Sequence, residues 1–302
     1  KVTNTVTAGE IVTNIADITK FTDGNKNTIS DRDSEGDNVK LPEDSKLPSY
    51  KDDEKGNYVP GQQDDDDFEK VKIKPFDLAL RKFIIAVSSD TEISDSEYLK
   101  DKNENYTRAP QVDTSKLNTT GTDGKLITTA TYNHPKTPVE VNKNDVVVYM
   151  LRIYNEGDVD GYATEIKDHL PSELEFVNGE FNTKYNWKVS EDGRTVTTDY
   201  LKDSKVEKSK KDASGKIVLN YVEVPIMCKL KDTAKVNQAI TNIADITKFT
   251  DGNKNTIKDR DSEEDNVKLP NDDQLPSYKD DEKGNYIPGQ QDDDDFEKVI
   301  IK

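Results

Sequence analysis

A lysine, an asparagine and an aspartate occupy apolar faces of three predicted strands. In the run 76–84, strand alternation puts Lys82 on the same face as the apolar side chains. The same alternation turns Asn242 towards the apolar face of 240–246, and Asp168 towards that of an earlier strand. A buried ammonium is costly even after the protein relaxes around it. Lys82 therefore needs a group that neutralises it.

These three residue types can form an intramolecular isopeptide bond. Burial favours the neutral forms of an amine and of a carboxyl group. Lys82 can then attack as a neutral amine while a protonated Asp168 donates a hydrogen bond to the Asn242 carbonyl. The attack expels ammonia and leaves a neutral amide in place of a buried charge. Glu165 and Asp245 are the competing candidates for the acid.

A purely structural role is the alternative for each residue. Lys82 can extend past the edge of the sheet into water, Asn242 can satisfy backbone groups, and Asp168 can cap the Leu-Pro turn that follows it. A β-bulge that shifts the register by one residue would also reverse the assigned faces. The residues alone leave both interpretations open.

Two acidic loops have the composition of calcium sites. Carboxylates this dense repel one another unless a hard cation collects them, and ligand sets made only of oxygen favour Ca2+. The alternative is a solvated acidic loop without a cation. The predicted ligands are Asp31, Asp33, Asp37, Asp64, Asp65, Asp66 and Asp67 in the first loop and Asp259, Asp261, Asp265, Asp292, Asp293, Asp294 and Asp295 in the second. Zinc is not expected, because the chain has two histidines.

An internal repeat organises the chain. Residues 14–74 recur as 242–302, an offset of 228 positions, with seven differences. A repeat of this length is typical of a tandem array of modules. Asn14 is the equivalent of Asn242, and the lysine that would pair with it is expected upstream of the sequence.

The repeat sets the expected module bounds. Residues 1–74 form the C-terminal part of one module, and 75–302 form a complete module with its acidic loop at 250–297. Lys74-Pro75-Phe76 joins the two with little slack, and Pro75 stiffens the joint. Calcium beside such a joint would fix the angle between modules, so we expect the array to behave as a rod.

Apolar patterns with a period of two predict an all-β chain. Residues 145–154 indicate a central strand that is apolar on both faces, and Asp192-Gly193 indicates a hairpin. Since no segment has helical periodicity over a helical length, we expect immunoglobulin-like β-sandwich modules in tandem. No apolar run reaches the roughly 18 residues of a membrane span. The net charge of -18 argues against nucleic-acid binding, and a single cysteine excludes an internal disulfide.

Two motifs resemble a known family. Residues 149–157 read Tyr-Met-Leu-Arg-Ile-Tyr-Asn-Glu-Gly, and 168–176 read Asp-His-Leu-Pro-Ser-Glu-Leu-Glu-Phe. Together they resemble the immunoglobulin-like repeat of bacterial surface proteins, which is related to the isopeptide-forming domains of Gram-positive fimbrial proteins and collagen adhesins. The resemblance covers most of 75–260. Glu173 stands where the family usually has glycine, which affects the turn and not the site.

The resemblance implies both a cross-link and a metal. Domains of that family place the linking lysine on an early strand, the asparagine on the last strand and an acid between them, which matches Lys82, Asn242 and Asp168. The acidic segments are also similar to the calcium-binding B repeats of adhesins. The resemblance further implies an extracellular location on the cell surface.

We therefore expect a structural stalk or fibre repeat and not an enzyme. Calcium and an autocatalytic Lys-Asn bond would stiffen each module, and the partners would be neighbouring modules and identical chains in a fibre. The alternative is an adhesin whose insertion at 88–135 binds a host protein or a glycan.

Overall fold

The structure of the chain, a computed structural model, consists of two compact units, Lys1–Lys74 and Pro75–Lys302. It describes residues 10–37, 42–50, 65–89, 106–267, 269–278 and 291–302. Unit 1 contains β1 (Ile11–Asp17), η1 (Asp44–Ser49) and β2 (Asp66–Lys72). Unit 2 contains β3 (Leu78–Ser88), β4 (Gln111–Asp113), β5 (Thr131–Asn133), β6 (Val139–Val141), β7 (Val146–Asn155), β8 (Gly161–His169), β9 (Leu174–Phe176), α2 (Glu180–Lys184), β10 (Lys188–Val189), β11 (Thr195–Thr198), β12 (Lys210–Lys211), β13 (Ile217–Val218), β14 (Asn220–Leu230), β15 (Ala239–Asp251), η3 (Leu275–Ser277) and β16 (Asp294–Ile301). The predicted all-β fold class is confirmed.

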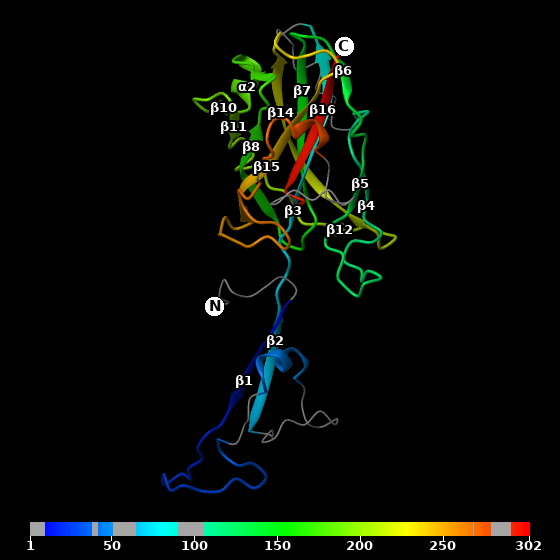
Figure 1. Ribbon diagram of the computed structural model, residues 1–302. Helices are drawn as coiled ribbons and strands as arrows, with labels where there is room; N and C mark the ends of the chain where they lie inside the picture. The colour runs from blue at the N-terminus through cyan, green and yellow to red at the C-terminus, as the bar shows by residue number, and fades with distance from the viewer. Residues whose placement is uncertain (1–9, 38–41, 51–64, 90–105, 268, 279–290) are drawn as a thin grey trace. The chain divides into compact units, whose positions relative to one another are not determined.

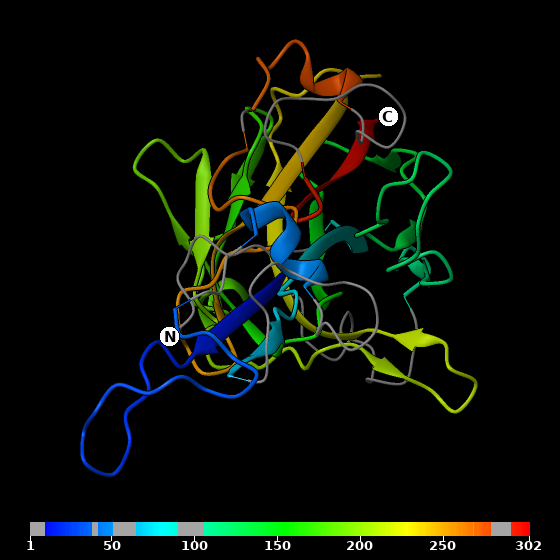
Figure 2. The ribbon, with the colours of Figure 1, turned by 90° about the horizontal axis from the view of Figure 1, so that it is seen from below.

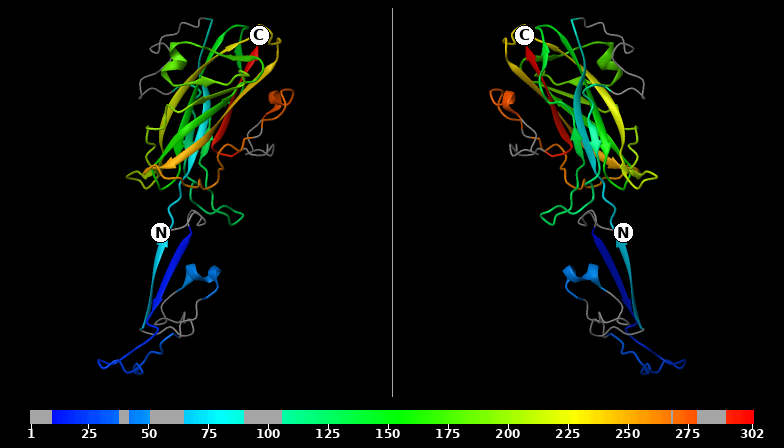
Figure 3. Two further views of the ribbon diagram at one scale, coloured as in Figure 1. Left: turned by 90° about the vertical axis from the view of Figure 1, so that its left-hand side faces the viewer. Right: turned by 90° about the vertical axis from the view of Figure 1, so that its right-hand side faces the viewer.

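Unit 2 is a β-sandwich of two sheets. One sheet has the strand order β3-β7-β14-β9, and the other has the order β10-β11-β8-β15-β16-β6. Figures 1 and 3 show the two sheets stacked along the length of the unit, and Figure 2 shows the small β12-β13 hairpin projecting from it. Alternating apolar residues of both sheets meet in one core, as expected for a sandwich.

The central strand β7 is buried along its whole length, as its apolar sequence on both faces predicts. Its inner face contributes Tyr149 and Leu151 to the core between the sheets. Its outer face is covered by side chains from other segments, among them Tyr106 against Met150 and Phe181 of α2 near Val148. The helix and the insertion thus complete the burial that one pair of sheets leaves open.

The short helix α2 departs from the sequence prediction. The hairpin across Asp192-Gly193 is confirmed, with Gly193 at a φ of 69°, but its first strand β10 has two residues. The buried Asn182 side chain binds the carbonyl oxygens of Val177 and Met227 at 2.8 Å each, and its Oδ1 accepts from the Met227 amide at 2.9 Å. These bonds hold a helical turn of five residues, too short to show a helical periodicity in the sequence. Among the described residues, no helix is long and apolar enough to cross a membrane.

The first and last strands of unit 2 lie side by side. The amides of Leu80, Lys82 and Ile84, which are alternate residues of β3, bind Asp292, Asp295 and Glu297 in that order. The strands β3 and β16 therefore run in the same direction. The chain therefore enters unit 2 at one end and leaves it at the other, as Figure 1 shows. A unit with this connectivity can be joined end to end with further copies of itself.

Unit 1 repeats the last two strands of unit 2. β1 pairs with β2 in the register in which β15 pairs with β16, so Asn14 lies opposite Glu69 as Asn242 lies opposite Glu297. The environments differ, because no second sheet covers this hairpin among the described residues of unit 1. Asn14 is therefore exposed, whereas Asn242 is buried.

This difference predicts unequal effects of one substitution at equivalent positions. Ile246 is 0% exposed and Ile18 is 53% exposed. Ile246→Ala is expected to destabilise unit 2 by about 2–5 kcal/mol, because it leaves a cavity in the core. Ile18→Ala is the matched control and is expected to change the free energy of unfolding by no more than about 0.5 kcal/mol. Urea unfolding of both variants checks this, and equal losses would contradict the assigned burial.

The insertion at 88–135 is tied to the sandwich in its described part. Its two short strands, β4 and β5, pair with each other. The Tyr132 ring lies 3.9 Å from the Arg81 guanidinium, and Arg108 binds both carboxylate oxygens of Glu297 at 2.9 and 3.0 Å. This segment therefore acts as a cover over β3 and β16.

Candidate functional site: a buried lysine and an acidic cluster

Lys82 and Asp168 form an ion pair in the interior of the sandwich. Lys82 comes from β3 in one sheet and Asp168 from β8 in the other, and both side chains are 0% exposed. The Lys82 Nζ donates to Asp168 Oδ2 across the core. The Asp168 Oδ1 has no hydrogen-bond partner among the described residues. A charged pair this deep is costly unless its remaining polar atoms are satisfied.

Asn242 lies beside this pair on β15. β8 and β15 are antiparallel neighbours in which Asp168 lies opposite Ala244, so Asn242 is the diagonal neighbour of Asp168 on the same face. The Asn242 side chain is 0% exposed, and neither its Oδ1 nor its Nδ2 has a partner among the described residues. Buried amides are almost always hydrogen-bonded, so this side chain needs an explanation.

Aromatic and apolar groups surround the three residues. The Lys82 Nζ lies 4.8 Å from the centre of the Tyr149 ring. Burial, followed by the charge of Asp168, raises the pKa of the Cys228 thiol well above its ordinary value. Cys228 is 0% exposed, and a buried thiol with a raised pKa is unreactive. The site is therefore closed to solvent. Among the described residues, Asp168 is the buried acid that contacts the Lys82 ammonium.

The two competing acids have other partners. Glu165 is half-exposed and binds the Thr247 hydroxyl at 3.0 Å and the Lys248 ammonium at 3.1 Å. Asp245 is buried on the face of β15 opposite to Asn242, where its Oδ1 lies 2.6 Å from His169 Nε2. Asp168 is therefore the acid that the structure brings to Lys82.

A row of acceptors from the acidic C-terminal segment lines the free edge of β3. The amides of alternate residues donate to it: Leu78 to Asp259 Oδ2 at 2.9 Å, Leu80 to the Asp292 carbonyl at 2.8 Å, Lys82 to Asp295 Oδ2 at 2.7 Å and Ile84 to Glu297 Oε2 at 3.4 Å. We call these four contacts the β3 seam. The seam satisfies edge amides that would otherwise be free to pair with another strand.

Four aspartates converge at the start of the β3 seam. One carboxylate oxygen from each lies within 4.8 Å of the others, and the four residues, called the acidic cluster below, are Asp77, Asp259, Asp261 and Asp292. Asp77 is 0% exposed and its Oδ1 has no hydrogen-bond partner among the described residues, while its Oδ2 pairs with Arg260. Both carboxylate oxygens of Asp261 are also buried without such a partner. An oxygen-only set of this kind fits Ca2+.

The remaining predicted ligands of the second loop lie elsewhere. Asp295 belongs to the β3 seam, where the Lys136 ammonium binds its two oxygens at 2.7 and 2.8 Å. Burial by itself would raise the pKa of Asp295. The charges of Lys136 and His134 outweigh burial and hold this pKa below its ordinary value. Asp294 accepts from the Gln291 amide at 2.6 Å, and Asp265 pairs with Lys167. Asp293 is buried outside the cluster.

The predicted ligands of the first loop do not form a cluster of this kind among the described residues. Asp31 and Asp33 are exposed, and Asp31 Oδ1 accepts from the Asp33 amide at 3.2 Å. Asp37, Asp65, Asp66 and Asp67 are described, whereas Asp64 lies outside the described residues. Asn14, the equivalent of Asn242, is exposed.

Sequence reasoning missed Asp77. It lies directly after the joint at Pro75 and far along the chain from the other members of the cluster, so no local motif connects them. The sequence does contain a sign of it, because Asp77 is an acidic residue at the start of a strand and the residues around it are apolar or cationic. Glu156 is a second buried acid nearby, and burial raises its pKa above the ordinary value.

Three members of the acidic cluster, Asp77, Asp259 and Asp292, have pKa values above the ordinary value of an aspartate. Burial, with added repulsion from Asp261, raises the pKa of Asp259 from 3.8 to about 7. Burial, followed by the charges of Asp292, Asp261 and Asp259, raises the pKa of Asp77 well above its ordinary value, and burial with repulsion from Asp261 does the same for Asp292. Each of these shifts opposes ionisation in the folded state.

When a chelator removes divalent cations, the free energy of unfolding of unit 2 is therefore expected to fall as the pH rises from about 4 to about 7. Over this interval the folded state keeps a proton on Asp259 that the unfolded state releases, so the free energy of unfolding falls with pH. Thermal melts at several pH values check this. Asp259→Asn should reduce the dependence, to which Asp77 and Asp292 also contribute, while Asp273→Asn, an exposed acid of the same loop, should retain it in full. Stability that rises with pH would contradict the assignment.

Similarity to known proteins is confined to structure. No protein-family model and no curated protein matches the chain. Similar solved structures include the pilus backbone RrgB of Streptococcus pneumoniae (TM-score 0.24, 20% identity, 39% of this chain and 27% of that chain) and the major pilin BcpA of Bacillus cereus (0.23, 17%, 45% and 43%). A cohesin of scaffoldin B from Acetivibrio cellulolyticus is similar at the same level (0.23, 13%, 40% and 87%). The matches thus span about a quarter of that RrgB chain and less than half of the BcpA chain. At TM-scores this low, the similarities carry no argument about what the chain does.

Proposed function

We propose that the protein is a structural fibre or stalk subunit of a cell surface, and that unit 2 is locked by an isopeptide bond between Lys82 and Asn242. The observation that carries the proposal is a fully buried Lys82-Asp168 pair beside a fully buried Asn242 amide without a hydrogen-bond partner among the described residues. An unsatisfied buried polar group costs about 1–3 kcal/mol. Formation of the bond would remove the Asn242 Nδ2, and a hydrogen bond from protonated Asp168 to the new amide carbonyl would satisfy the other two unpartnered atoms, Asp168 Oδ1 and Asn242 Oδ1.

The reaction needs no group from outside the chain. A proton passes from the Lys82 ammonium to Asp168, which leaves a neutral amine and a carboxylic acid in a site without water. Protonated Asp168 donates to the Asn242 carbonyl, the Lys82 Nζ attacks Cγ, and a Nζ–Cγ bond replaces the Cγ–Nδ2 bond. The attacking nitrogen gives up one proton, which Asp168 relays to the amide nitrogen, and this nitrogen leaves as ammonia while Asp168 remains protonated. The product is a neutral secondary amide.

The position of the bond suits a load-bearing role. Force that acts along a chain of units enters unit 2 at Pro75 and leaves at Lys302, through the neighbouring strands β3 and β16. A bond from Lys82 to Asn242 would shield the segment between them from extension. The β3 seam and the acidic cluster hold the rest, because they join Asp77 and β3 to Asp259 and Asp292.

Charge balance in the seam supports a calcium ion at the acidic cluster. Asp295 has Lys136 and Glu297 has Arg108 as cationic partners. The cluster contains four carboxylates. Among the described residues, the ion pair that it forms is that of Asp77 with Arg260. A divalent cation would supply the missing positive charge, and Asp77, Asp259, Asp261 and Asp292 would hold it. Extracellular modules bind Ca2+ with dissociation constants of about 10⁻⁴ to 10⁻³ M.

Stretching single molecules of the full chain tests the mechanical proposal. When unit 2 unfolds under force, the segment between Lys82 and Asn242, which is most of the length of the unit, is expected not to contribute to the gain in extension. Lys82→Arg cannot form the bond and is expected to release that segment. Full extension of the unmodified chain would refute the load-bearing cross-link.

A further inference from the structure

The β3 seam connects the acidic cluster directly to the reactive lysine. Its first two contacts use cluster residues, since Asp259 binds the Leu78 amide and Asp292 binds the Leu80 amide. The next contact along the same edge is the Lys82 amide with Asp295. The cluster and the lysine thus lie on one strand and are held by one acidic segment.

The same segment also positions the other reacting residue. β16 pairs with β15 so that Glu297 lies opposite Asn242, and Glu297 accepts from the Ile84 amide at the end of the seam. The distance between β3 and β16 therefore controls the approach of the Lys82 amine to the Asn242 amide. In a close-packed core, such an approach has little tolerance.

The two halves of the seam differ in how their charge is balanced. Lys136 and Arg108 hold Asp295 and Glu297 in place with ion pairs of 2.7 and 2.9 Å. At the other half, the carboxylates of Asp259, Asp261 and Asp292 repel one another, and Asp77 adds a buried oxygen without a hydrogen-bond partner among the described residues. Without a cation, these acids either repel one another as carboxylates or keep their protons and accept hydrogen bonds more weakly. Both states weaken the hold of this segment on the Leu78 and Leu80 amides.

We propose that a divalent cation at the acidic cluster sets the rate of the Lys82-Asn242 cross-link by aligning β3 on the acidic segment. This inference rests on the proposed function. The cation takes no part in the bond change, in which Nζ–Cγ forms, Cγ–Nδ2 breaks and ammonia leaves. It acts on the geometry of the chain, and Asp77, Asp259, Asp261 and Asp292 are positioning residues for the reaction.

Cross-linking during synthesis of the full chain tests the coupling. The chain is made in a cell-free reaction that contains a calcium-selective chelator, and it is then divided between chelator and millimolar Ca2+. Intact mass spectrometry follows the loss of one ammonia with time, and calorimetric titration reports Ca2+ binding on the same samples. Because a displacement of about 1 Å can cost about 10²-fold in rate, we expect at least a tenfold faster loss with Ca2+.

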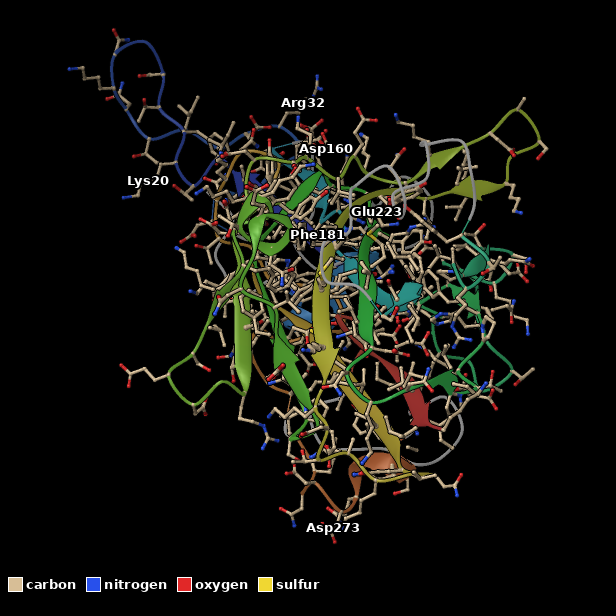
Figure 4. All side chains as sticks on the ribbon, turned by 90° about the horizontal axis from the view of Figure 1, so that it is seen from above. Lys20, Arg32, Asp160, Phe181, Glu223 and Asp273 are labelled. Atoms are coloured by element: carbon tan, nitrogen blue, oxygen red, sulfur yellow. The ribbon has the colours of Figure 1, made fainter. Side chains whose placement is uncertain are left out.

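Two variants separate alignment from other effects. Asp292→Asn keeps the backbone carbonyl that binds the Leu80 amide and removes a cluster charge, so its rate should no longer respond to Ca2+. Asp273→Asn, labelled at the outer rim of the same loop in Figure 4, should respond as the unmodified chain does.

The outcomes distinguish the coupling from the bond itself. Equal rates with and without Ca2+ overturn the coupling and leave the cross-link intact. A Ca2+ response that survives in Asp292→Asn also overturns it, because the cation then acts elsewhere. No loss of ammonia in any sample refutes the cross-link and the coupling with it.

Discussion

Asp168→Asn is expected to slow cross-link formation by at least about 10²-fold, the usual contribution of a positioned acid. The asparagine has the size of the aspartate but can neither accept the proton of Lys82 nor return it to the reacting amide. The intact mass of the purified chain should then equal that of its unmodified sequence. Circular dichroism checks that the variant is folded, because the substitution also leaves Lys82 buried without a counter-charge.

Three further variants make this result specific. Asn242→Ala keeps the Lys82-Asp168 pair and removes the electrophile, so it should fold and retain its full mass. Glu165→Gln changes a half-exposed acid that binds Thr247 and Lys248, and it should lose ammonia as the unmodified chain does. Asp245→Asn disturbs the contact with His169 and should also permit the reaction. Normal cross-linking in Asp168→Asn would identify another acid as the proton carrier.

Removal of Ca2+ is the second change with a large expected effect. At a free concentration of 100 times the dissociation constant, binding stabilises the folded state by about 2.7 kcal/mol. For a unit of this size, 1 kcal/mol corresponds to about 2–4 °C in Tm. Addition of a chelator near neutral pH is therefore expected to lower the Tm of unit 2 by about 5–10 °C.

The effect should depend on the cluster alone. Asp77→Asn and Asp261→Asn are expected to melt at the same temperature with and without Ca2+, because each removes one of the four carboxylates. Asp265→Asn changes an acid of the same loop that pairs with Lys167, and it should keep the full response. An unchanged Tm of the unmodified chain on chelation would show that the acidic loop holds no structural cation.

The sequence was sufficient for the inward faces of the reactive residues. Period-two alternation assigns Lys82, Asn242 and Asp168 to the core, and a shift of one residue would have reversed all three. The structure does contain such irregularities, between Ile84 and Ala86 and between Ile246 and Lys248. Both follow the reactive residue on its strand, so the alternation counted from the start of each strand remains valid.

Loop geometry was beyond the reach of the same reasoning. The run of four aspartates at 292–295 reads as one cluster, yet Asp292 joins Asp77 while Asp295 turns to Lys136. Asp292 precedes β16 and Asp295 lies within it, and the partners of the two side chains come from segments far away in the chain. In the first loop Asp31, Asp33 and Asp67 are exposed and Asp65 and Asp66 are half-buried, because no second sheet covers this hairpin among the described residues of unit 1.

The most direct test of the central claim is peptide mapping of the purified full chain by tandem mass spectrometry. We predict a branched peptide in which Lys82 is joined to Asn242 with the loss of one ammonia, and no free counterpart of either peptide. Separate linear peptides that carry unmodified Lys82 and Asn242 would contradict the account.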